Sequence, residues 1–145
     1  MSEAKPKAST PAPVVVDLEW EGGLRFHARA GEESVILEND SKNGLTPVQA
    51  LALGLAGCMA MDVAHVLRKS RLEPSALRVH LEAERQAEHP RRLLRVDLHF
   101  KVAGEIPPDR VERAIALSRE TYCSVWHSMR PDIELRTSFE VVERA

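Results

Sequence analysis

The sequence has few of the features that mark specialised classes of protein. It contains only two cysteines among 145 residues, too few for the disulfide framework of a small secreted domain. Aromatic residues make up 4% of the chain and the formal net charge is -2 at pH 7, so composition indicates neither a nucleic-acid nor an anionic membrane partner. Metal-site spacings such as C-x-x-C, H-x-x-x-H and H-E-x-x-H are absent from the sequence. We therefore expect no metal and no bound cofactor.

Long hydrophobic runs are also scarce. The uncharged apolar stretch 50–61 is 12 residues long, whereas a membrane span needs about 20 apolar residues. Residues 1–13 are rich in Ala, Pro, Ser, Thr and Lys and lack the apolar core of a secretory signal. We expect residues 1–12 to be a flexible tail and the protein to be cytoplasmic. In a reducing compartment, a cysteine pair is more often reactive than structural.

The composition is that of a folded domain. Hydrophobic residues make up 43% and charged residues 29% of the chain, as in ordinary globular proteins. The length suits a single hydrophobic core. We therefore expect one domain over residues 13–145.

Hydrophobic periodicity predicts an α+β fold with antiparallel sheets. Alternating apolar residues on either side of a Gly-Gly turn predict a hairpin. The predicted order is three strands, a long helix, two strands, a second helix and a last strand. The corresponding ranges are 14–20, 24–30, 34–38, 46–69, 77–83, 94–102, a helix opening at 107–109 and ending near 123, and 133–141.

The long helix is unusual because it is apolar on nearly every face. Thr46 suits its N-cap, Pro47 its first position and Gln49 a capping box. Gly54 and Gly57 lie in a narrow stripe of small residues that would let another backbone approach closely. Such a helix must be buried on all sides. The sequence leaves two arrangements open, a central helix wrapped by sheet and a helix packed against a second subunit.

Two readings of the cysteines are equally supported by residue chemistry. Cys58 lies within the long helix and Cys123 near the end of the second one. They could form a peroxide-reducing pair of thiols, or both could be inert and buried. A reactive thiol must ionise near neutral pH, so its pKa of about 8.5 needs a nearby cation to lower it, while burial raises it. Asp62, one helical turn after Cys58, would also raise that pKa, and we interpret it as a polar anchor.

Two segments resemble the osmotically inducible protein C / organic hydroperoxide resistance family. The first runs from Thr46-Pro47-x-Gln49 to Gly-Leu-Ala-Gly-Cys58-Met-Ala-Met-Asp62, and the second is Tyr122-Cys123-Ser-Val. With the order of elements, the resemblance covers roughly residues 14–142. It implies an intertwined homodimer with long helices at its centre and active sites at the subunit interface.

The resemblance also implies a function. Members of the family are thiol-dependent peroxidases that act on organic hydroperoxides, with hydrogen peroxide as a second candidate substrate here. By position, Cys58 would be the peroxidatic thiolate, Cys123 the resolving thiol and Arg25 the activating arginine, with Arg29 as the alternative. The electrons would come from an external thiol or dithiol reductant rather than from a cofactor.

One departure from the family pattern affects the activity. Peroxidase members carry a glutamate about ten residues before the first cysteine, where it pairs with the arginine, but this sequence has Val48 followed by Gln49. We therefore expect Arg25 to lack its usual tether. This departure leaves open whether the protein catalyses repeated reduction of peroxide. The alternatives are a non-enzymatic small-molecule binder or redox sensor, and a structural module with inert cysteines.

Overall fold

The computed structural model describes residues 9–144, and the chain divides into two compact units, Met1–Pro47 and Val48–Ala145. Residues 1–8 of the predicted tail lie outside the described residues. Residues 9–16 form neither helix nor strand. The flexibility of the tail and the single domain stay predictions.

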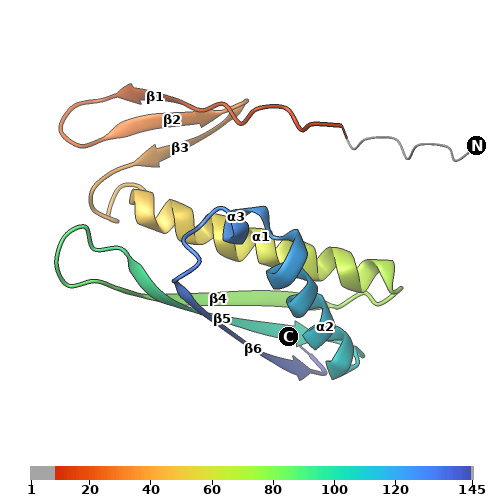
Figure 1. The fold of residues 1–145 in the computed structure, drawn as a ribbon. Helices are drawn as coiled ribbons and strands as arrows, with labels where there is room; N and C mark the ends of the chain where they lie inside the picture. The colour runs from red at the N-terminus through yellow and green to blue at the C-terminus, as the bar shows by residue number, and fades with distance from the viewer. Residues whose placement is uncertain (1–8, 145) are drawn as a thin grey trace, which may run out of the picture. The chain divides into compact units, whose positions relative to one another are not determined.

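The first unit contains a three-stranded antiparallel sheet in the order β1-β2-β3 (Figure 1). The strands are β1 (Asp17–Trp20), β2 (Phe26–Ala30) and β3 (Glu33–Leu37). Gly22 and Gly23 have φ angles of 101° and 56°, which glycine adopts without a steric penalty, and they close the β1–β2 hairpin. The predicted hairpin and third strand are confirmed, although β1 begins only at Asp17.

The second unit contains the remaining elements in the predicted order, with one extra short helix. They are α1 (Pro47–Lys69), β4 (Ala76–Arg85), β5 (Leu93–Ala103), α2 (Pro108–Leu117), a π-helical turn (Ser118–Tyr122), α3 (Ser124–His127) and β6 (Glu134–Val142).

The sheet of the second unit has the order β4-β5-β6. The β4–β5 pair is antiparallel, but β5 and β6 are parallel, so the prediction of purely antiparallel sheets is wrong for this pair. Parallel neighbours need a long crossover connection. Residues 104–133 supply it, because they include α2, the π turn and α3.

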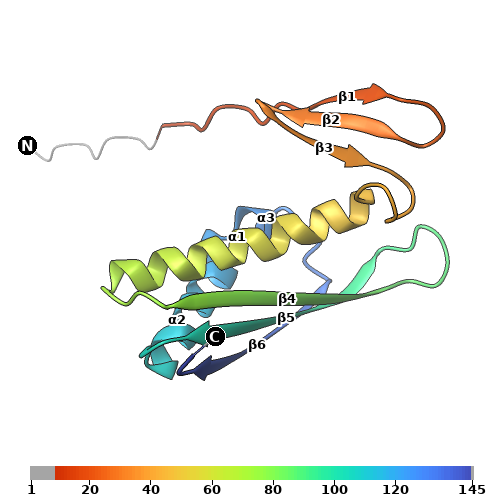
Figure 2. The ribbon, with the colours of Figure 1, turned by 180° about the vertical axis from the view of Figure 1, so that it is seen from behind.

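The core lies against one face of this sheet. Along β5, every second side chain is buried, at Val96, Leu98, Phe100 and Val102, while the residues between them are only half-buried or exposed. The buried face packs against a stripe of α1 and an apolar side of α2 (Figure 2). The α1 stripe consists of Leu55, Met59, Val63 and Leu67, and the α2 side of Val111, Ala114 and Ile115.

Only one stripe of α1 is buried. Leu51, Leu53 and Met61 have exposed fractions of 43%, 57% and 73%, so the expectation of burial on all sides is wrong for this chain alone. By length and composition α1 would also suit a membrane span, but its buried stripe makes it the core helix of the second unit. The exposed apolar side chains of α1 are typical of a helix face that packs against another protein surface.

Candidate functional site

The structure brings the two cysteines together. The Sγ atoms of Cys58 and Cys123 and a carboxylate oxygen of Asp62 all lie within 4.8 Å of one another. We call these three residues the thiol cluster. Cys58 and Asp62 lie one turn apart on α1, and Cys123 joins them from the segment between α2 and α3.

A π-helical turn places Cys123. At the end of α2 the chain widens over Ser118–Tyr122, and the N–H of Cys123 donates to the carbonyl of Ser118 at 2.8 Å. Such turns are often found at functional sites. Here the turn ends at Cys123, which is fully buried, so the second thiol is held in the core beside α1.

The carboxylate of Asp62 is anchored by a buried hydroxyl. Ser118 Oγ donates a hydrogen bond of 2.7 Å to Asp62 Oδ2, and Ser118 has no exposed surface. This confirms that Asp62 acts as a polar anchor, with a hydroxyl as its partner rather than an amide or an arginine. The bond also fixes the position of the third member of the thiol cluster.

The first turn of α3 supplies a backbone donor to each sulfur. The N–H of Trp126 donates to Cys123 Sγ at 3.3 Å, and the N–H of Val125 donates to Cys58. Ser124 Oγ lies 3.9 Å from Cys58 Sγ. Hydrogen bonds to a thiolate stabilise the charged form, so these groups favour ionisation at the sulfurs.

The pKa of the Cys58 thiol is lowered. Burial raises it, but the hydrogen bonds from the Val125 N–H, the Cys123 thiol and the Ser124 hydroxyl outweigh that effect. Asp62 opposes them by its negative charge, as the sequence predicted. Because the donors prevail, Cys58 is the thiol that ionises first.

The pKa of Cys123 moves the other way, to about 11. Burial is the main cause, and its hydrogen bond to Cys58 and the negative charges of Cys58 and Asp62 add to it. Cys123 is therefore protonated at neutral pH and can donate its proton to the Cys58 thiolate. The two thiols therefore have unequal acidity, and Cys58 is the more acidic of the two.

Arg25 is held within the first unit. Its guanidinium bonds to the carboxylates of Glu21 and Glu38, both at 3.2 Å, and to the carbonyl of Asn43 at 3.1 Å. Arg25 lacks the family glutamate, as expected, but it is not free, because two acids from other positions, Glu21 and Glu38, hold its guanidinium. Val48 itself packs against the core. The roles of Arg25 and of its alternative, Arg29, in activating Cys58 stay predictions.

Sequence reasoning missed three contributors to this site. The N–H groups of Val125 and Trp126 leave no trace in side-chain patterns. Ser118 did leave one, because it is a hydroxyl on the otherwise apolar side of α2. A polar residue in such a position needs a buried partner, and that partner is Asp62.

The thiol cluster also has the chemistry of a metal site. Cysteine sulfur and carboxylate oxygen are zinc ligands, and three such atoms lie close together here. Zinc binding would require Cys123 to lose its proton, against a pKa of about 11. The expected absence of a metal stays a prediction.

Fold and site together define an α+β protein with an adjacent pair of thiols of unequal acidity, carried by a long helix and a π turn. The chain belongs to the OsmC-like protein family, whose model matches residues 39–138.

Three relatives show the range of similarity. Protein YhfA of Escherichia coli strain K12 is 32% identical over 128 residues, covering 86% of this chain and 96% of its own. A hypothetical protein from Aquifex aeolicus has a structure with a TM-score of 0.84 at 27% identity, covering 90% and 97% of the two chains. The organic hydroperoxide resistance protein OsmC of Legionella pneumophila has a TM-score of 0.70 at 17% identity, covering 92% and 100%. The last likeness shows the fold alone.

Proposed function

We propose that the protein is a thiol-dependent peroxidase that reduces organic hydroperoxides through Cys58 and Cys123. One observation carries the proposal: the two sulfurs lie within 4.8 Å of each other, and their pKa values are shifted in opposite directions. An inert pair of thiols would not require such a difference in acidity. Family membership and the name of the Legionella protein fit the same chemistry.

In the first step, the Cys58 thiolate attacks one oxygen of the hydroperoxide. A sulfur–oxygen bond forms and the oxygen–oxygen bond breaks, so Cys58 becomes a sulfenic acid and the peroxide leaves as an alkoxide. The alkoxide takes a proton and departs as the alcohol. The lowered pKa of Cys58 supplies the thiolate, which is the nucleophilic form.

In the second step, Cys123 attacks the sulfenic sulfur of Cys58. A disulfide forms, and the hydroxyl of the sulfenic acid leaves as water with the proton of Cys123. Oxidation of Cys58 also removes its negative charge, which is one cause of the raised pKa of Cys123. The resolving thiol therefore becomes easier to ionise only after the first step is complete.

An external thiol or dithiol returns the disulfide to two thiols and is itself oxidised. No bound cofactor is needed for this cycle. A reducing cytoplasm would supply such a reductant, so we place the protein there.

We further propose that the protein is an intertwined homodimer. Leu51, Leu53 and Met61 form an exposed apolar face on α1, and a second copy would cover it. A Cβ atom built on Gly54 or Gly57 meets nothing within 4 Å, so this face has room for the close approach of another helix. The subunit interface is also where the family resemblance would place Arg25 beside Cys58.

Consumption of cumene hydroperoxide with dithiothreitol as reductant tests the proposal. We expect multiple turnovers by the wild-type protein and none by Cys58→Ser. Full activity in Cys58→Ser would overturn the assignment of Cys58. Formation of one disulfide per chain without turnover would instead favour a redox sensor. This is the alternative function suggested by Val48, which stands where peroxidase members of the family have a glutamate.

A further inference from the structure

A second candidate site adjoins the thiol cluster. A cavity of about 450 Å³ lies between the C-terminal half of α1 and the side of α2. Asp62 belongs both to this cavity and to the thiol cluster. The volume is in the range of small-molecule sites, and all of its lining residues belong to the second unit.

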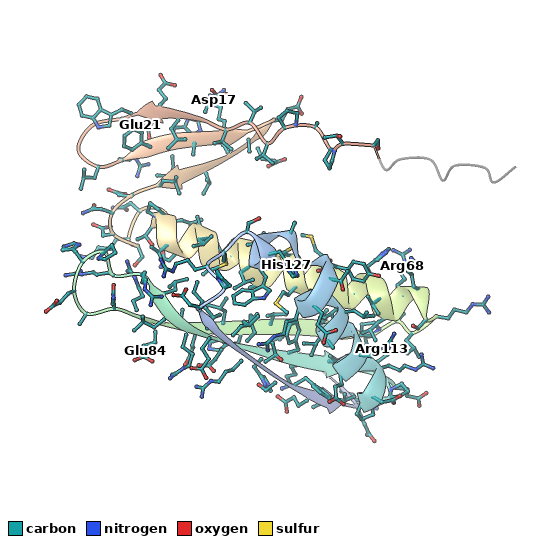
Figure 3. The ribbon with its side chains drawn as sticks, in the orientation of Figure 1. Asp17, Glu21, Arg68, Glu84, Arg113 and His127 are labelled. Carbon is teal, nitrogen blue, oxygen red and sulfur yellow. The ribbon has the colours of Figure 1, made fainter. Side chains whose placement is uncertain are left out.

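The cavity is rich in positive charge. Lys69 comes from the last turn of α1, and Arg110 and Arg113 come from α2, where Arg113 is labelled in Figure 3. Among residues 9–144, neither Lys69 nor Arg113 has an ion-pair partner, and Arg110 has only its neighbour Asp109 at 4.0 Å. Asp62 is the one acid in the lining, and Ser118 already occupies one of its oxygens.

Helix stability does not explain this charge. Lys69 is favourably placed at the negative end of the α1 dipole. Arg110, however, lies in the first turn of α2, which begins at Pro108, and a cation is unfavourable near the positive end of a helix. An arginine that costs helix stability there, together with a second arginine and a lysine on the same cavity, is typical of a site that binds an anion.

The remaining lining indicates the class of ligand. Three cations, offset in the lining only by Asp62, exceed what a single carboxylate requires and suit the charge of a phosphate group. Val66, Leu117 and the exposed ring of Tyr122 line the same cavity and would contact an apolar or aromatic group. We propose that the cavity binds an organic phosphate, with the phosphate at Lys69, Arg110 and Arg113.

This site has a defined relation to the thiols. Lys69 lies 11 residues after Cys58 on α1, about 16 Å along the helix axis. A phosphate held near Lys69 leaves room for the rest of the ligand to extend along α1 toward Asp62. The site would thus bind the phosphate group of a molecule whose other end reaches the thiol cluster.

Phenyl phosphate is the probe, and binding is measured by isothermal titration calorimetry and by NMR shifts of the cavity residues. The protein is the full chain with Cys58→Ser, so that the outcome does not depend on peroxidase activity. We expect saturable binding that is tighter than that of inorganic phosphate, because the ring adds apolar contact, and tighter than that of benzoate, because the charge is larger.

Charge-removing variants locate the site. Arg110→Ala and Arg113→Ala should each weaken phenyl phosphate binding by roughly 2- to 5-fold, since exposed charge pairs contribute modestly. Arg78→Ala, an exposed arginine on β4 outside the cavity, is the matched control and should change nothing. Equal loss in Arg78→Ala, equal binding of benzoate, or no saturable binding would each overturn the proposal.

Discussion

The hydroxyl of Ser118 donates a 2.7 Å hydrogen bond to the carboxylate of Asp62, across 56 residues of sequence. The bond joins the end of α2 to the middle of α1 and holds a negative charge beside two sulfurs. That charge works against ionisation of Cys58, so the site combines groups that favour the thiolate with one that restrains it.

Asp62→Asn should lower the pKa of Cys58. The amide keeps an acceptor for Ser118 but removes the negative charge, so ionisation becomes easier, by up to roughly one pKa unit. The measurement is the pH dependence of iodoacetamide reaction at Cys58 in a Cys123→Ser background. The profile should move to lower pH, and a shift to higher pH would contradict the charge argument.

Peroxide treatment should join Cys58 and Cys123 within one chain. Their sulfurs start within 4.8 Å, so a modest movement forms the bond. Mass spectrometry should find the linked peptides after one equivalent of cumene hydroperoxide. In Cys123→Ser, excess cumene hydroperoxide should oxidise Cys58 beyond the sulfenic acid to the sulfinic acid, since each of the two steps consumes one equivalent of peroxide. Sulfinic Cys58 beside a free Cys123 in the wild-type protein would argue against a resolving role.

Arg25→Ala should raise the pKa of Cys58 if its guanidinium reaches the thiolate in the assembled protein. A close pair would give roughly one to three pKa units, each worth about 1.4 kcal/mol. Alkylation at neutral pH would then slow, again in the Cys123→Ser background. Glu38→Gln, which loosens a contact of Arg25, should give a smaller change in the same direction.

Arg29→Ala is the comparison for that experiment. If only Arg29→Ala slows alkylation, Arg29 is the activating residue. If neither substitution changes the profile, the hydrogen bonds from Val125, Cys123 and Ser124 account for the reactivity of Cys58 without an arginine.

Gly54→Leu should dissociate the dimer without unfolding the subunit. A Cβ atom built at this position meets nothing within 4 Å in the single chain, and leucine is a better helix former than glycine. Only a second copy packed against α1 would clash with it. Sedimentation velocity at micromolar concentration should show a dimer for the wild type and a monomer for the variant. A monomeric wild-type protein would contradict the proposed dimer.

The strands and helices could be predicted because each has a distinct hydrophobic period. The alternation from Leu94 to Val102 and the caps around Pro47 placed β5 and the start of α1 within a residue or two. The parallel direction of β6 was missed, because the period of two that identified the strand is the same in both directions. The signal lay in the long helical connection before the strand, which suits a crossover to a parallel neighbour, but its path over the sheet cannot be read from the sequence.

The pairing of Cys58 with Cys123 was predicted from the family resemblance, but the electrostatics of the two thiols were not. Sequence reasoning assigned the lowered pKa of Cys58 to an arginine, whereas the structure supplies backbone and hydroxyl donors. Backbone N–H groups carry no sequence signature, and their direction depends on the first turn of α3. The cavity cations were equally hidden, because Lys69 and Arg113 lie 44 positions apart in the sequence.

The π turn makes the site depend on chain length as well as on residue identity. Each residue of an α-helix rotates the chain by about 100°, so removing one residue from 118–122 would turn everything that follows to another side of the helix axis. Both cysteines would still be present in such a deletion variant, yet the second sulfur would no longer face the first. The close approach of the two sulfurs therefore depends on the one extra residue that the π turn adds to the helix.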